Sequence, residues 1–226
     1  MSSKRAADAV MVILRSYRRC PPDFDADDPF EVLVATILSQ NTNVKNAGYA
    51  LRSLRQGRCL SPKRISRMTL HQVKSRIRAS GLYESKARSI KAAADYIQNE
   101  YHGDMREMLQ QDPGLLRKEL LTVKGVGPKT ADIILAFCAG VPTVPVDTHI
   151  ARISARLGLV GPKDGYDQIK ERLEGVIPRG RRLAGHLALI NFGMEVCLAR
   201  KPKCQICPVQ NLCPYYSTLN RGIRGH

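Results

Sequence analysis

Apolar residues recur every three or four positions along most of the 226-residue chain, which is the period of an amphipathic α-helix. The longest such pattern covers residues 84–101. A shorter one near the start has its apolar face formed by Ala7, Val10, Ile13, Leu14 and Tyr17. Further helices are predicted over 128–139, 148–157, 166–176 and 180–199. Strand patterns separated by hairpin turns are missing from the sequence, so the predicted fold class is all-α.

Several helix starts can be read directly from pairs of residues. An N-cap side chain followed by proline at the first helical position is a typical start signal. It occurs at Asp28–Pro29, Ser61–Pro62 and Asp112–Pro113. The stretch "VPTVPVD" (141–147) is predicted to be extended, because Pro142 and Pro145 exclude a helix there. We interpret it as a crossing between two helical lobes.

The charge balance indicates the class of partner. Lys and Arg number 36 against 20 Asp and Glu, which gives a net charge of +16. Such an excess favours nucleic acid, since phosphate contacts supply most sequence-independent affinity. An anionic membrane surface or a merely basic soluble protein is the alternative. No uninterrupted apolar stretch approaches the ~18–20 residues of a membrane span. The Arg-rich N-terminus also permits a mitochondrial presequence, but its helical spacing favours a part of the fold.

The seven cysteines fall into two groups. Cys20, Cys59 and Cys138 are scattered and are expected to act as small buried side chains. The other four form C-x6-C-x2-C-x5-C at positions 197, 204, 207 and 213. A disulfide framework is disfavoured, because this long basic chain lacks the small secreted context typical of one. Spacing alone leaves structural zinc and an iron–sulfur cluster equally open.

The stretch "KGVGPK" (124–129) predicts a hairpin between two helices. Gly125 and Gly127 permit positive φ and close approach of a ligand, and exposed N–H groups beside a helix N-terminus bind anions such as phosphate. Lys129 would lie in the first turn, where the helix dipole and an apolar setting disfavour its ammonium form and lower its pKa. It is then either a nucleophile or a phosphate contact. Asp147 is the predicted N-cap of the next helix, which does not prevent it from facing a cleft, and His149 is predicted to pack or lie on the surface.

Together these segments closely resemble the endonuclease III branch of the helix-hairpin-helix DNA glycosylases. The resemblance rests on "LLTVKGVGPKTADIILAF", "VPVDTHIARISARLG" and the cysteine spacing, with "ILSQNTNVKNA" and "GLYESKARSI" in the expected order. It spans roughly residues 25–214. It implies that the four cysteines Cys197, Cys204, Cys207 and Cys213 hold a [4Fe–4S] cluster rather than zinc.

The resemblance also implies an architecture. A six-helix bundle over residues 22–133 would carry the hairpin, and residues 1–21 and 134–226 would form a second helical lobe with the cluster loop. Duplex DNA with a damaged base or an abasic site would lie in the cleft between the lobes. We expect a monomer without a membrane partner. It would act in the cytoplasm at the nucleoid of a prokaryote, or in the nucleus or mitochondrion of a eukaryote.

The family's catalytic residues fall on Lys129 and Asp147. The implied activity is a bifunctional DNA glycosylase and AP lyase that excises oxidised pyrimidines through a lysine Schiff base and nicks the strand by β-elimination. Mismatch glycosylases acting on adenine or thymine are an alternative, but they typically lack this lysine. A non-catalytic DNA-binding iron–sulfur protein would need neither Lys129 nor Asp147.

Supporting DNA contacts are implied at several further positions. Leu82 matches an apolar wedge that enters the duplex, and its alternative is a core leucine. Gln40, or its neighbour Asn41, would fill the space left by the flipped base. The remaining expected contacts are Lys124, Gly125, Val126 and Gly127 in the hairpin, and Arg200, Lys201 and Lys203 in the cysteine loop. Pro128 departs from the family pattern, which often has a polar or basic residue there.

Overall fold

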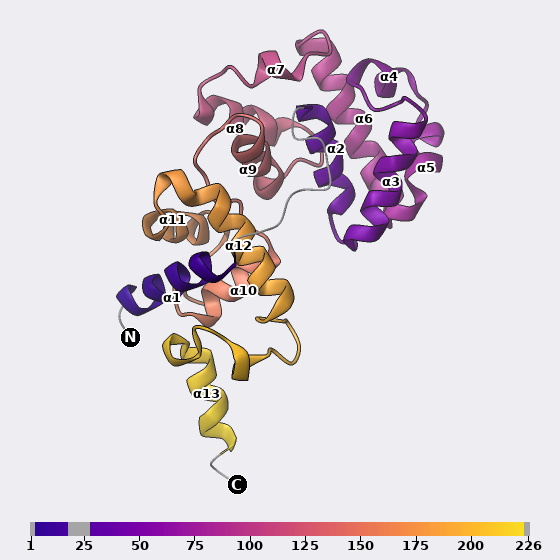
Figure 1. Ribbon diagram of the computed structural model, residues 1–226. Helices are drawn as coiled ribbons and strands as arrows, with labels where there is room; N and C mark the ends of the chain where they lie inside the picture. Colours follow the sequence, from indigo (N-terminus) through magenta and orange to yellow (C-terminus); the bar gives the residue numbers. More distant parts are fainter. Residues whose placement is uncertain (1–2, 18–27, 224–226) are drawn as a thin grey trace. The chain divides into compact units, whose positions relative to one another are not determined.

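The computed structural model describes residues 3–17 and 28–223, and helices are the only regular structure in those residues (Figure 1). The predicted all-α class is therefore confirmed. The chain divides into two compact units. Pro22–Val141 form what we call the central unit, and Met1–Pro21 with Pro142–His226 form the terminal unit. Among the described helices, none is both long and apolar enough to cross a membrane.

The central unit is built around α2 (Pro29–Ser39), nine of whose residues are buried. This helix packs against α3, α6, α7 and α9. The other elements of the unit are α3 (Val44–Gln56), α4 (Pro62–Arg67), α5 (Leu70–Ile77), η1 (Arg78–Ser80), α6 (Tyr83–Glu100), α7 (Met105–Met108), α8 (Pro113–Thr122) and α9 (Pro128–Phe137). Six of these α-helices have eight or more residues, and the short α4 and α7 supplement the predicted six.

The three predicted helix starts of this unit are confirmed by their hydrogen bonds. Asp28 accepts from the N–H groups of Phe30 and Glu31 at the start of α2. Asp112 and Ser61 cap α8 and α4 in the same way, each followed by proline. These caps satisfy N–H groups that have no partner inside the helix. Local sequence alone therefore fixes where these helices begin.

The terminal unit combines the first helix with the last third of the chain. Its elements are α1 (Ser3–Ser16), α10 (Thr148–Arg156), α11 (Tyr166–Val176), η2 (Arg179–Arg181), α12 (Arg182–Glu195), η3 (Cys204–Ile206), η4 (Gln210–Leu212) and α13 (Pro214–Ile223). Ile13 of α1 and Phe192 of α12 lie in one apolar core, and the Tyr17 ring meets Phe192 edge-on at 5.4 Å. The N-terminal amphipathic pattern is thus part of the fold.

Some boundaries differ from the predicted ones. The division between the units falls at 141/142, whereas the expected boundary at 133/134 lies inside α9. The helix continues to Phe137 because Ile133 and Leu135 belong to the core of the central unit. The helix predicted over 180–199 starts with the η2 turn and ends at Glu195.

The scattered cysteines are partly buried. Cys59 and Cys138 are half-buried against the core of the central unit. Burial raises the pKa of the Cys138 thiol to about 12, with a smaller contribution from Asp28. A thiol with so high a pKa is unreactive at neutral pH, as expected for a packing role. Cys20 lies outside the described residues.

Candidate functional site

The predicted hairpin connects α8 and α9 through residues 123–127. Gly125 has a φ of +87°, and a Cβ added there would overlap the side chain of Ser89 on α6. Glycine is needed at this position for both reasons: the left-handed backbone and the close seat on α6. Gly125 thereby fixes the position of the hairpin against α6.

Two details of the hairpin differ from expectation. Gly127 has an extended backbone with φ −97° and needs no positive φ; an added Cβ would meet nothing within 4 Å. Val126 is buried, and its N–H donates to the Val123 carbonyl oxygen at 3.0 Å. Its amide is therefore used inside the turn, and the DNA contact expected at Val126 stays a prediction. Lys124 is exposed as expected.

Helix α9 begins without a capping side chain, because its N-cap is Gly127. Pro128 occupies the first helical position as predicted. The N–H groups of Lys129 and Thr130 lie in the first turn, where an α-helix supplies no internal partner. Lys129 itself is half-buried and makes no ion pair with any described residue. The helix start thus presents free donors and an unpaired amine together.

The hairpin is braced by an ion pair that sequence reasoning missed. The Asp132 side chain on α9 is fully buried, and Arg117 Nε on α8 donates to its Oδ1 at 2.8 Å. A buried carboxylate needs such a partner. The signal was an aspartate inside the apolar run "KTADIILAF". This pair fixes the two helices of the hairpin relative to each other.

Gln40 is the C-cap of α2 and contacts the hairpin directly. Its Nε2 lies 3.3 Å from the carbonyl oxygen of Gly125 and 3.3 Å from Thr130 Oγ1. Asn41 follows in the left-handed conformation, with φ +51°, and is exposed. The structure therefore brings Gln40 to the hairpin next to Lys129, whereas Asn41 turns the chain.

Leu82 lies on the surface, which excludes the alternative of a core leucine. Its side chain is 61% exposed, and its backbone is left-handed with φ +46° and ψ +30°. A leucine rarely adopts this conformation without a surrounding structure that imposes it. Gly81 precedes it with φ +61°, and a Cβ added to Gly81 would lie 3.9 Å from Thr42 Oγ1. The Leu82 turn is thus a neighbour of the turn that follows α2.

In the terminal unit, Asp147 is the N-cap of α10, as predicted. Its Oδ1 accepts from the Ile150 N–H at 2.8 Å, and its side chain is half-buried. His149 is half-buried in the same turn and packs against Gly193 of α12, where an added Cβ would lie 2.8 Å from the His149 Cβ. Of the two predicted positions for His149, packed or on the surface, the structure shows the packed one.

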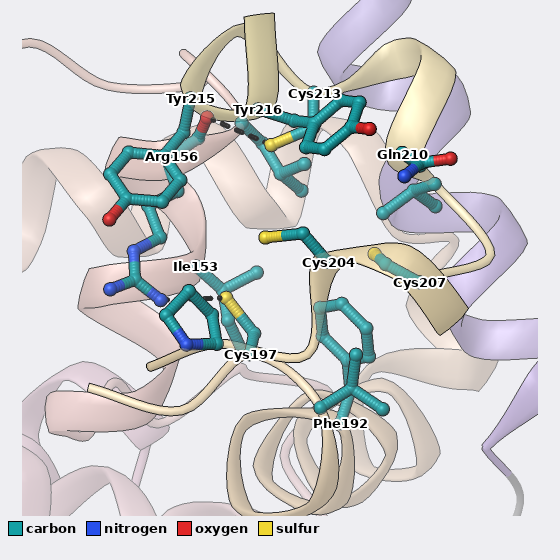
Figure 2. A pocket seen from close by; sticks show the side chains of 14 residues that line it. Ile153, Arg156, Phe192, Cys197, Cys204, Cys207, Gln210, Cys213, Tyr215 and Tyr216 are labelled. Atoms are coloured by element: carbon teal, nitrogen blue, oxygen red, sulfur yellow. Dashed lines mark hydrogen bonds between the residues drawn. The ribbon is translucent and has the colours of Figure 1, made fainter. Parts of the chain in front are cut away.

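The four C-terminal cysteines line one pocket of the terminal unit. Figure 2 shows the sulfur atoms of Cys197, Cys204, Cys207 and Cys213 around a common space. The rest of the lining is mostly apolar, with Phe192 among the side chains that form it. The exposed basic residues of the adjoining loop are Arg200, Lys201 and Lys203. These three belong to the terminal unit, as does Asp147, whereas Lys129, Gln40 and Leu82 belong to the central unit.

The chemistry of this donor set fits a thiolate-bound metal cluster. Burial raises the pKa of the Cys207 thiol to about 11, against a smaller lowering by the Val209 backbone, and the neighbouring cysteines raise it further. Burial and the other cysteines also raise the pKa of Cys204. Conversion of Cys204 and Cys207 to thiolates at neutral pH therefore needs a cation that compensates their charge. Arg156 Nη1 donates to Cys197 Sγ at 3.3 Å, which supplies a hydrogen bond that a sulfur ligand accepts.

Comparison with known families agrees with both parts of the site. Residues 34–179 match the HhH-GPD superfamily of base excision DNA repair proteins. Residues 197–213 match the iron–sulfur binding domain of endonuclease III, and this interval begins and ends at the outer two cysteines. The predicted [4Fe–4S] cofactor is thereby confirmed for the chain.

Individual proteins give the same result. Endonuclease III of Sulfolobus acidocaldarius is 36% identical over 83% of this chain and 82% of its own. Endonuclease III of Escherichia coli is 32% identical over 85% and 87%. A trapped covalent intermediate of an endonuclease III with DNA superposes with a TM-score of 0.86 at 27% identity, covering 98% of this chain and 100% of the other. The chain belongs to the endonuclease III family, within the HhH-GPD superfamily of base excision DNA repair proteins.

Proposed function

We propose that this enzyme is a bifunctional DNA glycosylase and AP lyase that removes oxidised pyrimidines from duplex DNA, with Lys129 as its nucleophile. The observation that carries the proposal is the unpaired, half-buried Lys129 in the first turn of α9. A cation is unfavourable at that end of a helix dipole, and packing does not require one there. An amine is, however, what a Schiff base needs.

The reaction follows from the chemistry of an amine and a sugar. The damaged nucleotide is first turned out of the stack, because C1′ cannot be reached inside the duplex. Lys129 Nζ then forms a bond to C1′ as the bond to the base breaks, and the base leaves with that electron pair. The nitrogen then loses a proton and the C1′–O4′ bond breaks, with its electron pair going to O4′, which is protonated; the iminium that results acidifies the proton on C2′. Loss of this proton expels the 3′ phosphate and nicks the strand.

Asp147 would stabilise the positive charge that develops in these steps, or remove a proton from the amine. Its Oδ1 is occupied by the Ile150 N–H. Its Oδ2 remains able to face the positive charge that develops on the sugar, or to accept a proton from the attacking amine. Both roles need an ionised carboxylate. The capping hydrogen bond orients this carboxylate before substrate binds.

We expect residues of both units to contact DNA. The uncapped start of α9 would bind a backbone phosphate with Lys124 nearby, since free N–H groups at a helix N-terminus attract anions. Leu82 would enter the duplex, and Gln40 would fill the vacated space. Arg200, Lys201 and Lys203 would contact further phosphates. The enzyme would act wherever the cell keeps its DNA, at the nucleoid in a prokaryote or in the nucleus or mitochondrion in a eukaryote.

Cys197, Cys204, Cys207 and Cys213 would hold the [4Fe–4S] cluster. When bound, the cluster cross-links the cysteine loop and can exchange an electron. The loop between the first two ligands presents the three basic side chains named above, so its conformation matters for phosphate contacts. The reaction at C1′ uses none of the cluster's chemistry.

Borohydride trapping tests this function. Duplexes carrying thymine glycol, an abasic site or a G·T mismatch are incubated with the enzyme and borohydride, which reduces a Schiff base to a stable adduct. We expect adducts with thymine glycol and the abasic site, and their loss in Lys129→Ala. Lys118→Ala is the matched control, because it removes an exposed lysine of α8, the other helix of the hairpin, that is assigned no DNA contact, and it should still trap. Base release without any adduct would instead indicate a monofunctional glycosylase.

A further inference from the structure

Lys86 is a buried lysine for which the proposed reaction has no use. It lies on α6 and is 2% exposed. Its Nζ donates to the carbonyl oxygen of Leu38 at 2.8 Å and to that of Ser80 at 2.6 Å. Burial lowers the pKa of this amine. A lysine held away from water in this way is costly to fold and needs a compensating role.

The two carbonyl groups belong to the ends of two different elements. Leu38 is in the last turn of α2, and Ser80 ends η1. Carbonyl groups at such ends have no partner inside their helix, and a positive group is favourable there. One amine therefore joins the end of α2 to the end of η1, although Leu38 and Ser80 are far apart in the sequence.

Each of these ends lies two residues before a side chain of the proposed DNA site. Gln40 follows Leu38, and Leu82 follows Ser80. The backbone of Lys86 adds a further link, because its N–H donates to the Leu82 carbonyl oxygen at 3.1 Å. The left-handed backbone of Leu82 is thus fixed through its own carbonyl and through that of Ser80.

The first two turns of α6 and the residue before them contact all three parts of the site. Lys86 and Ser89 are spaced i and i+3, so they are neighbours on the helix surface, and Leu82 is the N-cap residue from which α6 starts. Leu82 is the exposed side chain proposed as the wedge. Lys86 joins the Leu82 turn to α2, and Ser89 packs closely against Gly125 of the hairpin. Gln40, at the end of α2, donates from its Nε2 to the carbonyl oxygen of the same Gly125 at 3.3 Å.

We propose that Lys86 is a positioning residue that holds the Leu82 and Gln40 turns in register, so that the wedge and the gap-filling side chain enter the duplex together. The proposal rests on the function proposed above. It assigns Lys86 to the opening of the duplex and gives it no part in the attack on C1′. Lys86 and Lys129 therefore act on separate steps, which separate experiments can resolve.

The test compares Lys86→Met with Lys91→Met. Lys91 is the matched control, since it also lies on α6 and its Nζ donates to a carbonyl, that of Ser66 at 2.8 Å, away from both turns. The first readout is the fluorescence of 2-aminopurine placed opposite a tetrahydrofuran site, which rises when the duplex is unstacked. This readout needs binding only, so it remains valid even if the enzyme forms no Schiff base and the proposed function fails.

The second readout separates opening from chemistry. For Lys86→Met we expect the single-turnover excision of thymine glycol from duplex DNA to slow by roughly 10- to 100-fold, as for a misplaced contact group. Borohydride trapping on a single-stranded abasic site should change by less than about threefold, because nothing has to be flipped there. Lys91→Met should match the unaltered enzyme in all readouts.

Loss of the fluorescence rise in Lys86→Met, with trapping on single strands retained, is the expected result. An unchanged rise would overturn the proposal, and so would equal losses on duplex and single strand, which indicate general damage to the fold. If Lys86→Met does not accumulate as folded protein, Lys86→Gln takes its place. Its side chain is one bond shorter and uncharged, so we expect a partial loss of the fluorescence rise with trapping on single strands retained, and no loss at all would overturn the proposal. In a Leu82→Ala background the Lys86 substitution should cost less than in the unaltered enzyme, because only its effect through the Gln40 turn remains; fully additive losses would show that it does not act through the wedge.

Discussion

Helices α9 and α10 carry the two proposed catalytic residues at their first turns, and they begin in opposite ways. Helix α10 has a charged cap: Asp147 accepts the Ile150 N–H at 2.8 Å. Helix α9 has glycine as its N-cap, no capping side chain and a lysine in its first turn. The first arrangement agrees with the helix dipole and the second opposes it.

The difference separates what folding requires from what the reaction requires. Asp147 would be expected at its position in a protein with no activity, because a carboxylate is among the preferred caps. Lys129 has no such explanation. A functional residue is recognised more securely where it contradicts the local preference than where it follows it. Substitutions at the two helix starts should therefore affect stability and activity in different proportions.

Replacement of Lys129 should produce the largest effect and the cleanest separation. In Lys129→Ala we expect strand nicking to fall by about a thousandfold or more, because the nucleophile is lost. Stability should remain unchanged or rise by up to about 1 kcal/mol, since an unfavourable cation leaves the first turn. Denaturant unfolding and single-turnover nicking measure the two quantities. A clear loss of stability would contradict the view that Lys129 is dispensable for folding.

Replacement of Asp147 should affect both quantities, and two variants divide them. Asp147→Asn keeps a good cap and removes the charge, so stability should hold within a few tenths of a kcal/mol while excision slows by about a hundredfold. Asp147→Ala loses the cap as well and should cost about 0.5–2 kcal/mol in addition. Full activity in Asp147→Asn would contradict the catalytic role of Asp147 and show that it acts only as a helix cap.

Loss of the cluster should destabilise α10, which lies in the same unit as the cysteines, and leave α9 of the central unit unchanged. The far end of α10 adjoins the cysteine pocket, where Arg156 Nη1 donates to Cys197 Sγ at 3.3 Å. In Cys207→Ala the visible absorbance of the cluster should disappear. Amide exchange in α10 should then accelerate roughly tenfold or more, while α9, in the central unit, keeps its protection. Equal acceleration in both helices would show that the cluster stabilises the chain as a whole.

The sequence predicted those features that depend on neighbouring residues. The Asp28–Pro29 and Asp112–Pro113 starts, Pro128 at the first position of α9 and the Asp147 cap were all correctly predicted, because caps involve residues two or three apart. The all-α class followed from periodicity for the same reason.

Features that depend on packing could not be predicted in this way. Whether Leu82 was exposed or in the core stayed open, since its exposure depends on a left-handed backbone that follows the Ser80–Gly81 turn, where Lys86 Nζ donates to the Ser80 carbonyl oxygen. Lys86 itself carried a signal that was not used: it lies on the apolar face of the 84–101 pattern with Ala87 and Ile90. A lysine on such a face is either a buried charge that destabilises the fold or a charge with a buried hydrogen-bond partner, and only the tertiary structure identifies the partner.

The smallest effect is expected from giving α9 the cap that it lacks. Gly127→Ser has room, since an added Cβ meets nothing within 4 Å and the backbone is extended. A serine cap would accept a first-turn N–H and stabilise the enzyme by a few tenths of a kcal/mol. The same N–H would then be lost to a DNA phosphate, so binding to undamaged duplex at low salt should weaken by about two- to fivefold.

Gly165→Ser is the control, because Gly165 is the N-cap of α11, which also begins without a side-chain cap; an added Cβ there would lie 3.1 Å from Gln168 Oε1, so that side chain has to shift slightly. Gly165→Ser should therefore gain less stability than Gly127→Ser, and only the variant at Gly127 should bind DNA more weakly. Gly127→Asp extends the series: it makes a stronger cap and adds a negative charge where a phosphate would lie, so stability and DNA binding should move further apart. Parallel changes at Gly127 and Gly165 would mean that the open start of α9 is not the phosphate site, and that its missing cap has no part in DNA binding.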